Sequence, residues 1–168
     1  AIKQAEKKAA TSVQAMQTTH AIRAIRRNYW FEKVWWFVSS ENYVVVGGKD
    51  AMQNEQLVRA HLKPGDVYVH ADIHEAPIAI VKRGKGGVGG GEIPPLTLAQ
   101  AGSMVICRSK AWESGMVTTA WWVHDHQVSK SGAGGQHLPT GRFAISGTTN
   151  YLPPNQLVMG VGVVFRVA

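Results

Sequence analysis

Apolar residues recur at two spacings along the chain, and each spacing predicts a different kind of element. Residues 1–29 contain no glycine or proline, and their apolar side chains recur every three or four positions, which predicts a long helix. The apolar runs WWFVSS and YVVVGG are separated only by Glu41 and Asn42, an arrangement typical of a β-hairpin. VYVHADIHEAP (67–77) alternates polar and apolar residues and predicts a further strand, with APIAIVKR as its hairpin partner.

Two internal helices are expected between these strands. Asp50 and Gln53 have the spacing of a capping pair at the start of the first. Thr97 and Gln100 can cap a second helix that runs to about Ser114. The remaining strands are predicted by VTTAWWVHDHQVSK, RFAISG and QLVMGVGVVFRV. Because strands dominate without a regular βαβ alternation, we expect an α+β fold, with a largely antiparallel or mixed β-sheet and two or three packed helices.

Positive charge is concentrated near the N-terminus. The net charge is +7, and residues 1–33 hold seven of the 18 Lys and Arg residues but only two of the 11 Asp and Glu residues. Such a basic segment suits a polyanion such as RNA, and a helix face solvated by lysines explains the charge equally well. We expect residues 1–28 to be the C-terminal end of a coiled-coil arm, residues 29–168 to form the folded domain, and both to come from a longer protein.

Composition argues against several classes of protein. No run of about 20 uncharged apolar residues exists, so we expect no membrane-spanning helix and no membrane partner. The N-terminal segment lacks the apolar run of a signal peptide. Cys107 is the only cysteine, which forbids an internal disulfide and fits a reducing compartment, the cytosol or the nucleus. Its apolar neighbours predict a buried, inert thiol.

Histidines and aspartates recur on two of the expected strands. His70, Asp72 and His74 share one face of the first, and His124 and His126 share a face of the second. Imidazole and carboxylate groups bind zinc, so a metal-dependent hydrolase is one hypothesis. Ligands four residues apart on a strand lie about 13 Å from each other, however, which is too far for one ion. We therefore favour a hydrogen-bonding polar face without metal or cofactor.

Two pairs of adjacent tryptophans, Trp35–Trp36 and Trp121–Trp122, lie on expected strands. Because neighbours on a strand face opposite sides, one ring of each pair must face outward or into a second layer. An outward indole can stack on an unpaired base, whereas helices on both sides of the sheet would bury both rings.

Five long segments carry a resemblance to a known family. They are, in order, YWFEKVWWFVSSENYVVVGGKDAMQNE, PGDVYVHADIHEAP, IPPLTLAQAGSMVICRSKAW, TTAWWVHDHQVSK and NYLPPNQLVMGVGVVFRV. From about Arg26 to Val167 the chain closely resembles the NFACT-R domain of the NEMF/Tae2/RqcH ribosome quality control proteins, above all their eukaryotic branch, nuclear export mediator factor. The preceding helix is similar to the end of that family's coiled-coil arm.

The resemblance implies a non-enzymatic RNA-binding module without a cofactor. Full-length members of the family bind large ribosomal subunits obstructed by peptidyl-tRNA and recruit tRNA for C-terminal tailing of the stalled chain. The implied partners are large-subunit RNA and tRNA, the ubiquitin ligase listerin through the full-length protein, and other domains of the same protein. The implied location is cytoplasmic and ribosome-associated, with the nucleus as a second compartment. The hydrolase and an intramolecular protein-docking domain remain the alternatives.

The chain departs from the family pattern at three places. Glu75 follows the second histidine of HADIH, where the family commonly has glycine, and a carboxylate there would repel a phosphate. Thr148 and Thr149 occupy a segment that is often basic in the family. The loop RGKGGVGGGE is longer than the usual linker.

Strand alternation predicts one RNA-binding face. Trp122, His124 and His126 share a side of their strand, and they form one patch with His70 and His74 if that side lies beside these two residues. Basic residues at the strand ends are expected to contact phosphates. The residues expected to bind RNA are Lys49, His70, Asp72, His74, Lys82, Arg83, Trp122, His124, His126 and Lys130, with Arg23, Arg26 and Arg27 extending the charge along the N-terminal helix.

Overall fold

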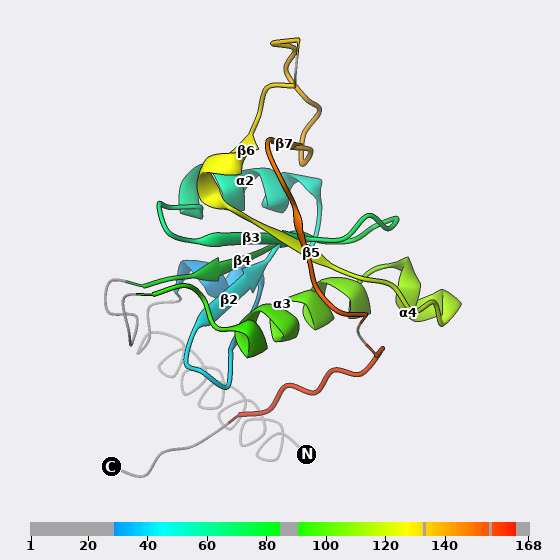
Figure 1. The fold of residues 1–168 in the computed structure, drawn as a ribbon. Helices are drawn as coiled ribbons and strands as arrows, with labels where there is room; N and C mark the ends of the chain where they lie inside the picture. The colour runs from blue at the N-terminus through cyan, green and yellow to red at the C-terminus, as the bar shows by residue number, and fades with distance from the viewer. Residues whose placement is uncertain (1–28, 85–90, 133, 155, 164–168) are drawn as a thin grey trace, which may run out of the picture. The chain divides into compact units, whose positions relative to one another are not determined.

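A six-stranded antiparallel sheet forms the centre of the fold (Figure 1). The computed structural model describes residues 29–84, 91–132, 134–154 and 156–163. The chain divides into two units, Ala1–Glu32 and Lys33–Ala168, and the second contains the sheet. The expected N-terminal helix, with Arg23, Arg26 and Arg27, lies outside the described residues.

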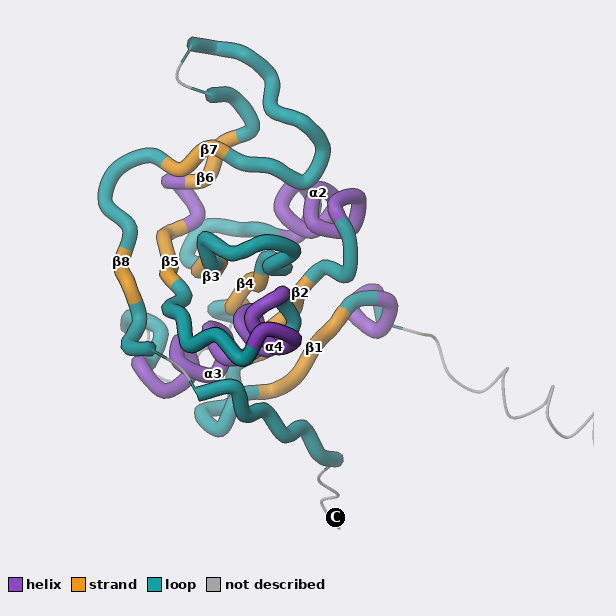
Figure 2. Tube along the Cα trace, turned by 90° about the vertical axis from the view of Figure 1, so that its right-hand side faces the viewer, coloured by secondary structure: helices purple, strands orange, loops and turns teal. Residues whose placement is uncertain are grey.

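Two local hairpins supply four strands of the sheet, as predicted. β1 pairs with β2 and β3 pairs with β4, both antiparallel, and β5 and β8 extend the sheet on the β3 side. Figure 2 shows the strands side by side in the order β1-β2-β4-β3-β5-β8. The α+β class is therefore confirmed. The strands are β1 (Trp35–Val38), β2 (Val44–Gly47), β3 (Val67–His70), β4 (Ala79–Lys82), β5 (Trp121–His124) and β8 (Asn150–Tyr151), with β6 (Val128–Ser129) and β7 (Ala144–Ile145) forming a separate pair.

The first internal helix begins as its sequence predicts. Asp50 accepts a hydrogen bond from the Gln53 backbone N–H (2.8 Å), and the Gln53 side chain accepts one from the Lys49 backbone N–H (3.1 Å). This reciprocal pair satisfies donors that a helix N-terminus leaves free. Helices and 3-10 turns in the described part are η1 (Trp30–Lys33), α2 (Ala51–His61), α3 (Pro95–Cys107), α4 (Lys110–Ser114) and η2 (Asp125–Gln127). None of these helices has the length and hydropathy needed to cross a membrane.

The second internal helix differs from the prediction at both ends. It begins at Pro95, and its N-terminus is capped from a distance because Glu41, in the β1–β2 loop, accepts hydrogen bonds from the backbone and hydroxyl of Thr97 (2.9 and 2.8 Å). It ends at Cys107, and Ser109 caps the separate helix α4. As predicted, Cys107 is buried, and its burial raises the pKa of the thiol.

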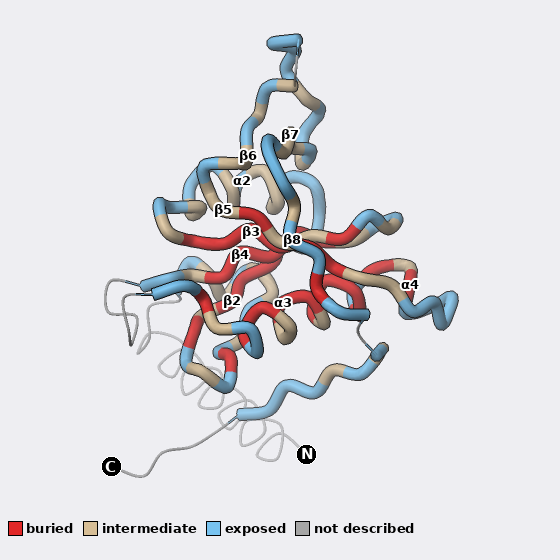
Figure 3. Tube along the Cα trace, in the orientation of Figure 1, coloured by how far each residue is buried: buried red, intermediate tan, exposed pale blue. Residues whose placement is uncertain are grey.

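The sheet is buried on both faces. On one face Val45, Val67 and Val81 pack with α3. On the other face Tyr68 and Ile80 are cross-strand partners and are also buried. Figure 1 shows α2 and α3 on opposite sides of the sheet, and Figure 3 shows burial concentrated between them. This two-sided cover explains why adjacent strand residues are both apolar.

For three of the expected strands, the predicted bounds differ from those in the structure. β3 stops at His70, so Asp72 and His74 lie in the following loop rather than on a strand. The expected long strand at 117–130 is broken by η2, because Asp125 turns away to accept a hydrogen bond from the Gly65 backbone N–H (3.0 Å). Residues 156–163, within the expected last strand, form no strand, whereas β8 occupies the turn expected before it.

Candidate nucleic-acid interface

The HADIH segment folds into a loop that is closed by His70. The His70 Nδ1 lies 3.1 Å from the Pro77 carbonyl oxygen, and because a carbonyl only accepts, Nδ1 carries the proton. Burial lowers the pKa of His70 below its ordinary value, although the Pro77 carbonyl and Asp72 oppose this shift. The ring is therefore neutral near pH 7, and its Nε2 is a hydrogen-bond acceptor.

Asp72 orients a tryptophan. Its Oδ1 accepts a hydrogen bond from the Trp121 indole (3.0 Å), and the His70 ring meets the same indole edge to face with centroids 5.6 Å apart. Among the described residues no three His, Cys, Asp or Glu side chains come together in a way that could hold a metal ion. The polar residues of this loop thus fix its shape.

His74 and Glu75 form the exposed tip of the loop. The side chain of His74 is 81% exposed, and its Nδ1 lies 3.6 Å from Glu75 Oε1. The other Glu75 oxygen pairs with Lys110 at 3.4 Å. Glu75 has φ 59°, in the left-handed region where a Cβ is unfavourable. Glycine would fit this backbone better, because it has no Cβ.

We expect Glu75→Gly to raise the free energy of unfolding by about 0.5–1 kcal/mol, because relief of the left-handed strain exceeds the entropy that glycine gains in the unfolded chain. The exposed ion pair with Lys110 contributes little against this gain. Urea denaturation of the two proteins measures the difference. Glu75→Ala is the matched control, since it removes the carboxylate but keeps the Cβ, and it should not stabilise. Equal effects of the two substitutions would show that backbone strain is not the cause.

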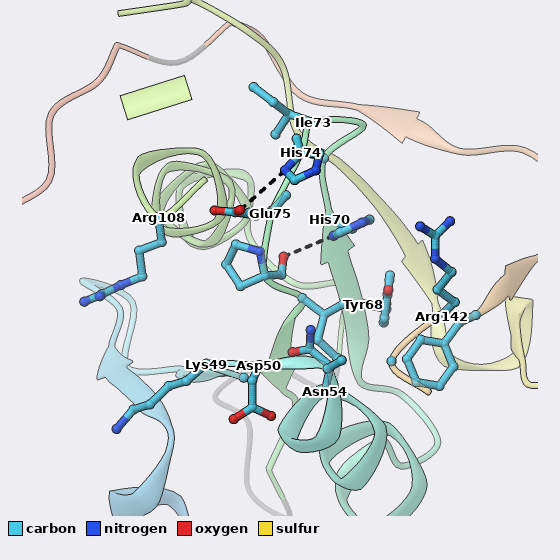
Figure 4. A pocket seen from close by; sticks show the side chains of 18 of the residues that line it. Lys49, Asp50, Asn54, Tyr68, His70, Ile73, His74, Glu75, Arg108 and Arg142 are labelled. Carbon is cyan, nitrogen blue, oxygen red and sulfur yellow. Dashed lines mark hydrogen bonds and ion pairs between the residues drawn. The ribbon is translucent and has the colours of Figure 1, made fainter. Parts of the chain in front are cut away.

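An open cleft of about 990 Å³ lies beside this loop (Figure 4). Three segments border it: the loop at 71–78, the start of α2, and residues 140–145. Aromatic side chains, Tyr68 and Trp121 among them, form part of its wall. Tyr68 is almost fully buried, which raises the pKa of its hydroxyl and keeps it neutral. The cleft combines aromatic surface with the accepting nitrogen of His70.

The carboxylates around the cleft have partners within the protein, whereas the cations there have no carboxylate partner among the described residues. Asp72 and Glu75 already have partners, as described above. Within the described parts of the chain, no carboxylate pairs with the side chains of Lys49 or Arg142, and Arg108 lies over the Trp35 ring (4.3 Å to the centroid). The cations are thus available to an anion, and the carboxylates are not.

Two lysines that were expected to contact RNA make ion pairs and hydrogen bonds within the protein. Lys82 pairs with Asp66 and donates to the His61 carbonyl (2.5 Å). Lys130 pairs with Glu55 (2.5 Å) and donates to two backbone carbonyls. Arg83 donates its backbone N–H to Asp66 Oδ1 (3.0 Å). The structure gives both lysines architectural contacts that a phosphate would have to displace.

The expected single face is divided between the two sides of the sheet. Cross-strand partners point to the same side, and His70 is the partner of Trp121, whereas Trp122 is the partner of Val69. Trp122 therefore packs toward the α3 core, away from His70. His124 stacks on His126 (centroids 5.5 Å apart) where η2 interrupts the strand. The condition for a single patch with His70 is therefore not met.

Of the expected residues, the structure brings Lys49, His70, Asp72 and His74 to the cleft. Sequence reasoning missed Arg108 and Arg142, and it placed Trp121 on the face away from the site. Arg108 occupies the break between two helices that were predicted as one, and Arg142 lies in a loop without periodicity. The one available signal was their positive charge.

Comparison with known proteins gives matches along nearly the whole chain. The family described as NFACT protein RNA binding domain matches residues 33–147. Over 167 residues the chain is 48% identical to the ribosome quality control complex subunit NEMF of Mus musculus, covering 99% of this chain and 15% of that protein. Over 169 residues it is 43% identical to the ribosome quality control complex subunit 2 of Schizosaccharomyces pombe, covering 99% and 16%. The chain thus spans about one sixth of these relatives.

A solved structure shares the fold. The C-terminal part of the fibronectin/fibrinogen-binding protein from Streptococcus suis matches with a TM-score of 0.55, covering 79% of this chain and 49% of that one. The sequence identity is 16%, so this likeness concerns the fold alone.

Proposed function

The chain belongs to the NFACT RNA-binding domain family, and on that premise we propose that it is a non-enzymatic RNA-binding module of a ribosome-associated quality control factor. The observation that carries the proposal beyond family membership is the cleft, where cations without carboxylate partners surround aromatic side chains. Phosphate contacts supply affinity for RNA, and aromatic rings accept unpaired bases. No observation on the described residues favours the metal-dependent hydrolase.

For the full-length protein, we propose the role that the resemblance implies. It engages large ribosomal subunits obstructed by peptidyl-tRNA, supports tRNA recruitment for C-terminal tailing, and helps to recruit listerin. This chain contributes RNA contacts with the large subunit or with tRNA, and the protein is ribosome-associated in the cytoplasm. Ribosome quality control is named for relatives that this chain matches over 99% of its length, which supports the proposal.

Binding of tRNA to the 168-residue chain is expected to weaken steeply with salt. If Lys49, Arg108 and Arg142 each neutralise one phosphate, the affinity should fall at least about 20-fold between 50 and 200 mM KCl. Fluorescence anisotropy with labelled tRNA measures this slope. Replacing all three residues by glutamine should flatten the log–log slope by about two units or more.

The matched control replaces three exposed cations that do not line the cleft, Lys33, Arg59 and Lys63, by glutamine. This control should keep most of the slope. A control slope as flat as that of the cleft variant would mean that net charge, rather than the cleft, sets binding. RNA cleavage that a chelator abolishes would support the hydrolase instead.

A further inference from the structure

The polar groups of the cleft require two different chemical groups on a ligand. His70 Nδ1 is bound to the Pro77 carbonyl, and its Nε2 has no hydrogen-bond partner among the residues that the structure describes. It is an acceptor and requires a donor from the ligand. The cations of the cleft require an anion. A ligand that satisfies both carries a neutral N–H donor and a negative charge.

Aromatic side chains lie next to this acceptor. Tyr68 precedes His70 by two residues on β3, and Trp121 is its cross-strand partner on β5, with ring centroids 6.2 and 5.6 Å from the imidazole. Phe143, from the segment across the cleft, meets Tyr68 edge to face at 6.3 Å and is only partly buried. Tyr68 and Trp121 are themselves buried, so a flat ring that enters the cleft would contact the partly exposed rings of His70 and Phe143.

We propose that the cleft holds one unpaired nucleotide of an RNA, with its base beside His70 and Phe143 and its flanking phosphates against Arg142 and Lys49. This inference rests on the proposed RNA-binding function and names the part of the RNA that the site takes. In the view of Figure 4, His70 and Arg142 lie towards one side of the cleft and Lys49 and Arg108 towards the other. That separation suits a strand that runs through the cleft with a phosphate on each side of the inserted base.

The chemistry selects an unpaired base over a duplex. A base inside a duplex is stacked and paired, so its ring faces and its amino group are not available to the cleft. The volume of about 990 Å³ accommodates a nucleotide but not a double helix. Because Nε2 only accepts, it prefers a base with an exocyclic amino group. Cytosine has one at the edge of its ring, where uracil has a carbonyl oxygen. The N3–H of uracil is also a donor, but it lies between two carbonyl oxygens that repel the lone pair of Nε2, and the two bases are alike in size.

Two ten-nucleotide RNAs, C10 and U10, test the proposal by fluorescence anisotropy with the 168-residue chain. We expect C10 to bind about fivefold more tightly than U10, the value of one net hydrogen bond. His70→Asn should bring the two affinities within about twofold, because asparagine can still donate to Pro77 but offers no acceptor at the Nε2 position. Arg142→Gln should weaken C10 about fivefold, whereas Arg59→Gln, outside the cleft, should have less than a twofold effect.

Circular dichroism melting of each variant establishes that it is folded, and Phe143→Leu provides a second cleft variant that should weaken both RNAs equally. Equal losses in Arg142→Gln and Arg59→Gln, with tRNA binding by the unmodified chain intact, would overturn the cleft proposal and leave the RNA-binding function standing. Equal affinity of the unmodified chain for C10 and U10 would overturn the assignment of the base to His70. Displacement of C10 by an oligoglutamate of equal charge would overturn the nucleotide proposal and identify an acidic peptide as the ligand of the cleft. Absence of salt-dependent tRNA binding would remove both proposals.

Discussion

Asp66→Ala is expected to lower the free energy of unfolding by about 3–5 kcal/mol, a large part of the total stability of a domain of this size. Asp66 is 3% exposed, and its two oxygens accept hydrogen bonds from the backbone N–H groups of Lys63 (2.8 Å) and Arg83 (3.0 Å) and from the ammonium of Lys82. These contacts tie the turn after α2 to β4. Alanine leaves both N–H groups without their acceptor and leaves a largely buried cation unpaired.

Urea denaturation provides the measurement for Asp66→Ala, with Asp50→Ala as its control. Asp50 is an exposed helix cap that accepts one backbone N–H, so its loss should cost about 1 kcal/mol. Adding Lys82→Met to Asp66→Ala should restore part of the stability, because the unpaired charge is then removed. If Asp66→Ala costs no more than Asp50→Ala, the carboxylate is not the anchor that its geometry indicates.

Features that depend on a few adjacent residues were predictable from the sequence. The β1–β2 hairpin follows from two apolar runs around Glu41 and Asn42, and Asn42 adopts φ 67°, a conformation that asparagine tolerates. The capping pair of Asp50 and Gln53 is equally local. In each case the physical cause, a turn or a free helix N–H, lies within four residues of the signal.

Features that depend on a distant partner were not predictable in the same way. The alternation of VYVHADIHEAP continues past His70, but the strand ends there because His70 binds Pro77 and closes a loop. Asp125 leaves β5 for the amide of Gly65, which breaks the expected strand at 117–130. Because a one-residue change in alternation reverses which side chains share a face, this break removed His126 from the predicted face.

The cleft could also be predicted only in part, because its side chains depend on distant partners. His70 and Asp72 were visible as a motif, but their roles, to close the loop and to orient Trp121, depend on groups at other positions. The segment that carries Arg142 is tied to α2, because Lys130 donates to the Arg142 carbonyl and both Lys130 and Gly141 bind Glu55. No spacing rule connects positions 55, 130 and 141, so the wall that they build could not be read from the pattern.

Lys130→Met is expected to lower the free energy of unfolding by about 2 kcal/mol and to free the 140–145 wall of the cleft from α2. The ammonium donates to Glu55 (2.5 Å) and to the carbonyls of Pro139 (2.8 Å) and Arg142 (3.1 Å). The Lys130 hydrogen bond and the Gly141 amide lower the pKa of Glu55, so their stabilising contribution is present at neutral pH and is lost as pH falls through that lowered pKa.

Hydrogen exchange separates this local release from global unfolding. In Lys130→Met the Gly141 amide, which donates to Glu55 at 2.9 Å, should exchange faster. The exchange rates of the buried β3 amides should rise only as much as the loss of global stability requires. Lys110→Met is the matched control, because Lys110 pairs with exposed carboxylates and its loss should change neither readout. Combining Lys130→Met with Glu55→Gln should cost less than the sum of the two single losses, since both break the same contact. Full additivity would show that the two side chains act independently, and the wall would then owe its position to other contacts.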